Sequence, residues 1–193
     1  GREIKKGSKV GIKGTTGSGK STLGNIIIGL LDPTKGQLFV DDILINSQNK
    51  LAWQKNISII PQNIFLNDVS IAENIAIGIE PKEINLEKVK NAARQAQIHD
   101  FIESTPNQYN EKVGERGIRL SGGQLQRIGI ARALYREAKI ILFDEATNQL
   151  DTNTESLIMQ SINNLDKETT ILFIAHRLST LENCDPIVDL DKI

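Results

Sequence analysis

The sequence predicts an α/β fold in which helices flank a mainly parallel sheet. Short apolar runs typical of buried strands alternate with segments of helical periodicity, and this alternation favours a parallel sheet covered on both faces. The 15 glycines concentrate up to Gly36 and again from Gly114 to Gly129. Because glycine permits left-handed backbone and close approach of a ligand, we expect the chain to wrap a ligand in these two zones.

Composition narrows the function classes. A formal net charge of −1 lacks the basic excess of a nucleic-acid binder. Cys184 is the single cysteine, which excludes an intrachain disulfide, and His99 and His176 are the only histidines, so no metal-ligand spacing of Cys and His exists. Near the start, the apolar run Ile26–Leu31 is too short to span a membrane, and no signal-peptide pattern is present. We expect a soluble, cytosolic chain.

The first third of the chain predicts a strand, a helix and a hairpin. The strand Val10–Lys13 runs into a glycine-rich loop, and the helix Ser21–Leu31 follows it. That helix is expected to stop before Pro33, because proline disfavours helix in the residue before it. An antiparallel hairpin and a buried strand come next, at Gln37–Val40 with Ile43–Ile45, and at Ile57–Ile60.

The middle is expected to be helical and the last third to return to alternating strands and helices. Ser70 and Ser121 each stand three residues before Glu73 or Gln124, which is the capping-box pattern at a helix start. The expected helices are 70–78, 86–98, 121–135, 152–165 and 178–183, and the expected strands are 140–143, 170–175 and 187–190. We therefore expect one domain over 1–193. Its α/β core is 1–63 and 137–193, with the hairpin at 37–45, and its helical subdomain is 64–136.

A phosphate-binding loop opens at Gly14. The stretch from Gly14 to Ser21 fits G-x-x-x-x-G-K-S/T, which combines a tight turn, a row of N–H groups and the positive end of a helix dipole. Lys20 is expected to bridge the β- and γ-phosphates, and Ser21 to ligate Mg²⁺. A chance glycine-rich turn is disfavoured because strand, loop and helix come in the order that the mechanism needs. The expected nucleotide-binding residues here are Gly14, Thr15, Thr16, Gly17, Ser18, Gly19, Lys20, Ser21 and Thr22.

Two carboxylates close the apolar strand that ends at Phe143. Asp144 and Glu145 are expected at the carboxyl edge of the sheet, beside the phosphate loop. Asp144 is predicted to hold Mg²⁺ through its waters, and Glu145 to polarise the attacking water. The alternative, that both acids only cap the next loop, is weak in a chain that also has a phosphate loop.

A second glycine-rich helix start lies at Leu120-Ser121-Gly122-Gly123-Gln124. It is a further potential anion-binding site in a chain that already has one for a single nucleotide. This surplus predicts that a second copy of the chain completes the site.

These motifs, in this order, resemble the nucleotide-binding domains of ATP-binding cassette (ABC) transporters, from about Gly7 to Leu190. The resemblance implies a phosphate-loop NTPase of RecA-like fold and makes Leu120–Gln124 the family's signature motif. It implies that Gln62 contacts Mg²⁺ or the attacking water, and that His176 contacts the γ-phosphate. The residues implied to bind the nucleotide of the second copy, or to pass signals between the two sites, are Ser121, Gly122, Gly123, Gln124 and Asp151.

Further segments resemble those of exporter-type members. Val113–Gly117 is similar to a segment that contacts the membrane domain, and Phe65-Leu66 with Ile71–Ile75 resemble a groove for its coupling helix. A solvated loop with a few core residues is the alternative. The chain departs from the family in having Lys13 at a usually apolar position and Leu125 at an often basic one. No aromatic residue precedes Gly14 to stack on adenine. We therefore expect a domain trimmed at both ends.

The predicted function is the ATPase motor of an exporter at the cytoplasmic face of a membrane. Two such domains close head to tail on two ATP·Mg²⁺ and contact transmembrane coupling helices, with no nucleic-acid partner. One alternative is a non-transport relative acting on DNA or ribosomes, which the charge and the lack of a coiled-coil insertion disfavour. Another is a nucleotide-binding fragment without turnover.

Overall fold

The computed structural model describes residues 3–115, 118–145, 152–163, 165, 167–175 and 181–192. The chain divides into two compact units. The first, here called the sheet unit, comprises Gly1–Ile59, Ala138–Glu145 and Lys167–Ile193. The second, the helical unit, comprises Ile60–Glu137 and Ala146–Asp166.

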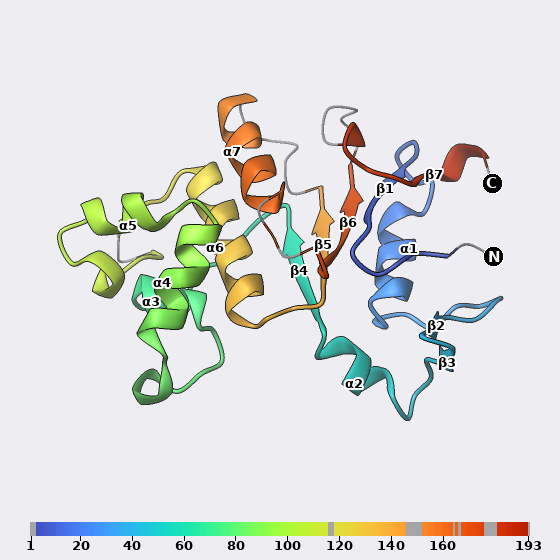
Figure 1. The fold of residues 1–193 in the computed structure, drawn as a ribbon, viewed down its shortest axis with the longest axis horizontal. Helices are drawn as coiled ribbons and strands as arrows, with labels where there is room; N and C mark the ends of the chain where they lie inside the picture. The colour runs from blue at the N-terminus through green and yellow to red at the C-terminus, as the bar shows by residue number, and fades with distance from the viewer. Residues whose placement is uncertain are drawn as a thin grey trace. The chain divides into compact units, whose positions relative to one another are not determined.

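The described strands of the main sheet lie in the order β4-β5-β6-β1-β7 (Figure 1). β1 pairs in parallel with β6 on one side and with β7 on the other, and β5 pairs in parallel with β6. The predicted α/β class with a mainly parallel sheet is thereby confirmed. The strand bounds are β1 Lys9–Lys13, β4 Ile57–Pro61, β5 Ile140–Asp144, β6 Thr170–Ile174 and β7 Ile187–Asp189.

The core of the sheet unit lies between the sheet and α1 (Lys20–Ile27). Gly24 of α1 faces the sheet so closely that a Cβ atom there would lie 2.7 Å from Cδ1 of Ile174. Phe143 of β5 and Phe173 of β6 each follow a leucine of this core in sequence, and their rings stack with the centroids 5.0 Å apart. Successive side chains of a strand point to opposite faces, so both faces of this sheet are apolar. The core beneath α1 consists of Val10, Ile12, Ile28, Ile57, Leu142, Leu172, Ile174 and Val188.

Helix α1 ends at Ile27, four residues before the predicted end at Leu31. Gly29 has a φ of 73° and donates its N–H to Ile26 O (3.0 Å), while Leu30 N–H donates to Asn25 O (2.8 Å). This is the hydrogen-bond pattern of a Schellman motif, which ends a helix at a left-handed glycine. The apolar residues continue through Leu31, and the helix predicted from them was therefore too long.

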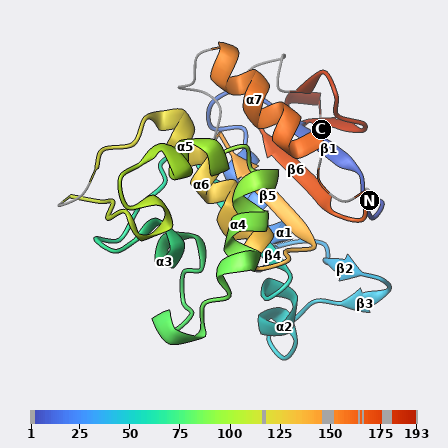
Figure 2. The same cartoon turned by 60° about the vertical axis from the view of Figure 1, so that its left-hand side comes forward.

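The antiparallel piece is a hairpin of β2 (Phe39–Val40) and β3 (Ile43–Leu44), seen in Figure 2. Asp41 and Asp42 have φ values of 48° and 65°, which suits a tight two-residue hairpin turn. The short helix α2 (Lys50–Gln54), which was not predicted from the sequence, is hydrogen-bonded to the end of α1. There the Trp53 indole N–H donates to Ile27 O at 2.8 Å.

The helical unit is built around α6 (Gly122–Tyr135), which packs against α3, α4 and α7. Ser70 and Ser121 each cap a helix start with the reciprocal hydrogen bonds of a capping box, as predicted. α4 ends at Gln95 instead of Ile98, since Gln97 has a φ of 56°. The other helix bounds are α3 Ile71–Ile75, α4 Leu86–Gln95, α5 His99–Ser104 and α7 Thr152–Asn163.

Short 3-10 turns complete the described structure at Pro81–Glu83, Gln108–Asn110 and Leu190–Lys192. Most of the helix predicted at 178–183 lies outside the described residues. Within the described ranges, no helix has the length and apolarity needed to cross a membrane.

Candidate nucleotide-binding site

The phosphate loop connects β1 to α1 at the carboxyl edge of the sheet. Gly17 and Gly19 have φ values of 83° and 95°, in the left-handed region that glycine adopts without strain. A Cβ atom at either position would meet no described atom within 4 Å. Glycine is therefore required at both positions by the backbone conformation, and the loop is open on that side to a ligand.

The N-terminus of α1 begins directly at this loop. Gly19 is its N-cap, no side chain of the described residues caps it, and its first turn holds no acidic residue. The first N–H groups of a helix have no intrahelical partner and carry the positive end of the dipole. Together with the open loop, this start suits a phosphate group.

Lys20 is 5% exposed, and its ammonium group lies across the loop. Its Nζ atom donates to the carbonyl oxygens of Gly14 and Thr15, both at 2.9 Å. Within the described residues, the buried hydroxyl of Ser18 has no hydrogen-bond partner. The loop thus holds one cation and one unpaired polar group where the sequence predicts phosphate.

Asp144 and Glu145 lie at the same edge, at the end of β5. Burial raises the pKa of Asp144, the nearby Glu145 carboxylate adds to this, and Lys20 opposes it. Glu145 has a φ of 53° and donates its N–H to Ile174 O of β6 at 2.9 Å. A left-handed conformation is uncommon for a residue with a side chain and often marks a functional position. The predicted carboxylates are thus next to the predicted phosphate loop.

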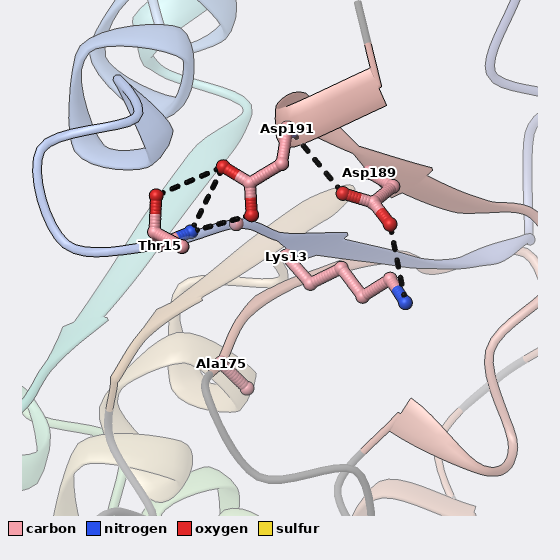
Figure 3. A pocket seen from close by; sticks show the side chains of 6 residues that line it. Lys13, Thr15, Ala175, Asp189 and Asp191 are labelled. Atoms are coloured by element: carbon pink, nitrogen blue, oxygen red, sulfur yellow. Dashed lines mark hydrogen bonds and ion pairs between the residues drawn. The ribbon is translucent and has the colours of Figure 1, made fainter.

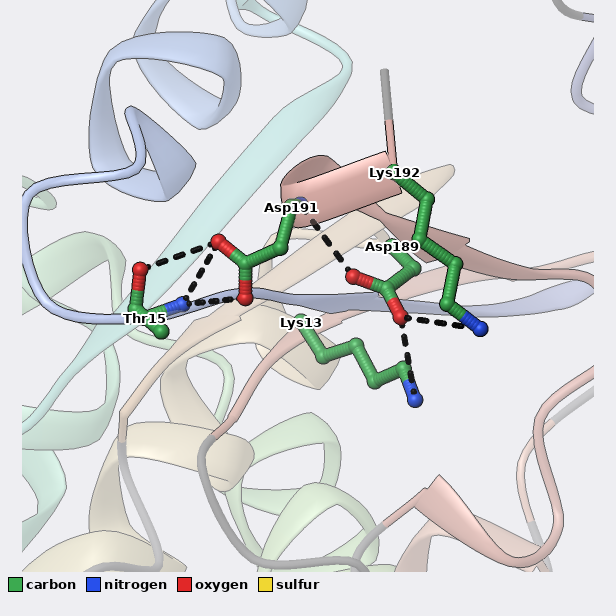
Figure 4. Close-up of polar contacts among 5 residues, drawn as sticks. All are labelled: Lys13, Thr15, Asp189, Asp191 and Lys192. Atoms are coloured by element: carbon green, nitrogen blue, oxygen red, sulfur yellow. Dashed lines mark hydrogen bonds and ion pairs between the residues drawn. The ribbon is translucent and has the colours of Figure 1, made fainter.

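Hydrogen bonds to the 3-10 turn Leu190–Lys192 also hold the phosphate loop (Figure 3). The Asp191 carboxylate accepts hydrogen bonds from the Thr15 N–H (2.9 Å) and hydroxyl (2.9 Å). Lys13 forms an ion pair with Asp189, its partner in the β1–β7 register, at 3.3 Å (Figure 4). These residues surround a pocket of about 310 Å³, lined by Lys13, Gly14, Thr15, Ala175, Asp189 and Asp191.

Asp189 and Asp191 were not predicted as site residues from the sequence. A signal was present, because a charged residue, Lys13 or Asp189, follows directly after each of two uncharged runs, 10–12 and 187–188. Nothing in the sequence indicated that these two strand ends are neighbours.

The signature motif starts α6 in the helical unit. Ser121 Oγ accepts from the Gln124 N–H at 3.3 Å, and the Gln124 side-chain oxygen accepts from the Ser121 N–H at 2.8 Å. Gly122 and Gly123 are the first two residues of the helix. A hydroxyl that accepts one hydrogen bond can still donate its own hydrogen, so Ser121 has a donor to offer a ligand.

Gln62 also lies in the helical unit, directly after β4, and is half-buried. The backbone carbonyl oxygen of Gln62 accepts a hydrogen bond from Gln126 Nε2 of α6 at 2.8 Å. Asp151 and His176, predicted to pass signals between sites and to contact the γ-phosphate, lie outside the described residues.

The described residues contain no group of three or more His, Cys, Asp or Glu side chains that could hold a metal ion. Mg²⁺ does not need such a cage, because it is commonly held by one or two protein ligands, substrate phosphates and water. Ser21, in the first turn of α1, and Asp144, at the end of β5, are oxygen donors of the required kind.

Comparisons with known proteins agree with this arrangement. A family model described as ABC transporter matches residues 2–148. The mouse (Mus musculus) ATP-binding cassette sub-family B member 5 is 44% identical over 189 residues, covering 98% of this chain and 15% of that protein. The ATP-dependent lipid A-core flippase of Saccharophagus degradans is 43% identical, covering 98% of this chain and 32% of that protein.

A solved structure of a bacterial Atm1-family ABC exporter with ATP bound matches with a TM-score of 0.87 and 39% identity, over 98% of this chain and 33% of that one. The chain thus spans 15–33% of the length of these relatives. The matches confirm the resemblance drawn from the motifs. This chain belongs to the ABC transporter family, and the part it spans is the family's ATPase domain.

Proposed function

We propose that this chain is the motor domain of an exporter, in which two copies bind two ATP·Mg²⁺ head to tail and hydrolysis separates them again. The observation that carries the proposal is the juxtaposition, at one sheet edge, of the glycine loop, buried Lys20 and the Asp144–Glu145 pair. The relatives named as a flippase and an exporter support the direction of transport.

The phosphate loop and Lys20 hold the triphosphate. The left-handed glycines turn backbone N–H groups toward it, and the ammonium of Lys20 exchanges its two carbonyl contacts for phosphate oxygens. Mg²⁺, when bound with the nucleotide, would supply charge neutralisation for phosphoryl transfer. Ser21 and Asp144 would hold the ion, and Gln62 is the further residue that we propose would contact it.

Glu145 orients and polarises the attacking water. Its carboxylate follows Asp144 in sequence, and its backbone is fixed to β6 by the hydrogen bond to Ile174 O. A group fixed in place before the reaction contributes more than a mobile one, because phosphoryl transfer depends chiefly on positioning and charge neutralisation. The proposal assigns His176 to contact with the γ-phosphate and Asp151 to the passage of signals between the two sites.

The second half of each site comes from the signature motif of the other copy. Ser121 donates its hydroxyl hydrogen to the γ-phosphate, and the N–H groups at the start of α6 add the dipole of a 14-residue helix. Because each copy supplies one half of two sites, ATP binding draws the copies together. A transmembrane domain contacts the helical unit at the cytoplasmic face and converts this closure into transport.

Glu145→Gln in the full-length protein tests the proposal. The variant is expected to keep ATP binding and accumulate closed dimers, which gel filtration with ATP detects, while steady-state ATPase falls at least 100-fold. Glu168→Gln, the same substitution at an exposed residue of the sheet unit, is the control and should hydrolyse ATP like the wild type. Normal ATPase activity in Glu145→Gln would refute the role of Glu145. Transport into inside-out vesicles should be lost together with hydrolysis.

A further inference from the structure

A buried glutamine of α6 contacts the segment that carries Gln62. Gln126 Nε2 donates to the carbonyl oxygens of Gln62 (2.8 Å) and Pro61 (3.2 Å). Gln126 is 4% exposed, so these contacts are shielded from water. They join the residue directly after β4 to the helix that begins with the signature motif.

The same side of α6 approaches this segment one turn further on. At Gly129, a Cβ atom would lie 2.7 Å from Ile64 Cδ1 and 3.5 Å from Ile60 Cγ2. Residues three apart on a helix lie on one side, so Gln126 and Gly129 face the same stretch, 60–64. The absence of a side chain at Gly129 lets that stretch lie close to the helix backbone.

Arg132 extends the attachment beyond residue 64. Its Nε atom donates to Asn74 O (2.7 Å), and a terminal nitrogen donates to Asn74 Oδ1 (3.0 Å). Asn74 is fully buried and also accepts from the Asn67 N–H at 3.0 Å. Helix α6 therefore holds the segment 60–74 at both ends.

Packing alone gives no reason for an amide at position 126. The Gln126 Oε1 atom is buried and has no hydrogen-bond partner among the described residues. An unpaired buried carbonyl is unfavourable, and methionine has a similar volume without that oxygen. Only the amide supplies a pair of N–H donors, and these donate to the backbone carbonyl oxygens of Gln62 and Pro61.

We propose that Gln126 is a positioning residue that fixes Gln62 to the signature helix. The inference rests on the proposed function, in which Ser121 binds the nucleotide of the second copy and Gln62 serves the nucleotide of its own chain. Ser121 and Gln126 lie five residues apart at the start of one helix, about 7.5 Å along its axis. A shift of α6 that engages Ser121 therefore also moves Gln62, and the helix links the two ATP sites.

A double-mutant cycle separates this role from a purely structural one. Wild type, Gln62→Ala, Gln126→Met and the double variant are compared in the full-length protein by kcat and KM for ATP. Gln126→Met is expected to lower kcat about tenfold, with KM within about twofold, because small misplacements of a catalytic group are costly. The double variant should fall within about twofold of Gln62→Ala, since both substitutions remove the same contribution. Gln95→Met, on the exposed side of α4, is the matched control.

Two results would overturn the inference: a wild-type kcat in Gln126→Met, or a double variant whose loss is the product of the two single losses. A normal kcat in Gln62→Ala would instead refute the role proposed for Gln62, and this inference with it. Thermal melting shows whether each variant is folded. If Gln126→Met does not fold, Gln126→Asn takes its place in the same cycle with the same criteria, because its amide is too short to reach both carbonyls.

Discussion

The close packing of α1 on the sheet gives a quantitative test of how the phosphate loop is supported. Gly24→Ala places a methyl group 2.7 Å from Cδ1 of Ile174 and 3.4 Å from the nearest methyl group of Leu142. Ile174 is only 1% exposed, so the new methyl group enters a closed core. Overpacking of this kind costs about 1–3 kcal/mol. Alanine is favoured over glycine in a helix by about 1 kcal/mol, so the net loss of stability is about 0–2 kcal/mol.

A compensating substitution makes this prediction decisive. The atom nearest the new methyl group is Ile174 Cδ1. Ile174→Val removes that atom and alone costs about 0.5–1.5 kcal/mol. In the double variant the alanine methyl occupies the vacated space, so the two changes together should cost less than their sum, by about 1–3 kcal/mol.

The assay uses urea unfolding followed by tryptophan fluorescence. Trp53 is the only tryptophan and packs against the core of the sheet unit, so its signal reports that unit. The four proteins of the cycle are compared at constant m-value. If Gly24→Ala alone stabilises by about 1 kcal/mol, as helix propensity by itself would predict, α1 is not as close to the sheet as described. Strict additivity would lead to the same conclusion.

Two further predictions concern titratable groups. Hydrogen bonds from the Ser70 hydroxyl and N–H hold the pKa of Glu73 below its ordinary value, so this contact stabilises the fold above about pH 4.3 and is lost as the pH falls through the lowered pKa. The difference in melting temperature between wild type and Glu73→Gln should therefore be largest at neutral pH and shrink below pH 4; a constant difference would contradict it. Burial raises the pKa of the Cys184 thiol to about 11. At pH 8 its reaction with a disulfide reagent should be at least about 100-fold slower in the folded protein than in urea, and equal rates would show that the thiol is accessible.

Features that depend on a few neighbouring residues could be predicted from the sequence. The capping boxes at Ser70 and Ser121 are examples, because each forms within four residues. The phosphate loop was found for the same reason. The end of α1 was placed wrongly although its signal is also local: Gly29 stands inside an apolar run, and the periodicity outweighed the glycine.

Features that depend on which distant segments of the chain are neighbours could not be predicted in this way. Gln126 gave no signal, because the carbonyls it binds are 64 and 65 residues away. The contact of Asp191 with Thr15 spans 176 residues. Each requires knowing that particular segments are neighbours, and apolar periodicity reports only which face of an element is buried.

The Lys13–Asp189 pair explains how the chain accommodates a charge at a position where the resemblance to the family leads us to expect an apolar residue. β1 and β7 place the two residues opposite each other, so the lysine at the end of β1 has a carboxylate partner within 3.3 Å. The pair is partly exposed and contributes little to stability by itself. Its consequence is electrostatic: the Asp189 carboxylate offsets the charge of Lys13 at longer range, and the charged groups that contact the phosphate loop directly are the Lys20 ammonium and the Asp191 carboxylate. We therefore expect Lys13 to leave phosphate binding to Lys20 and the N-terminus of α1.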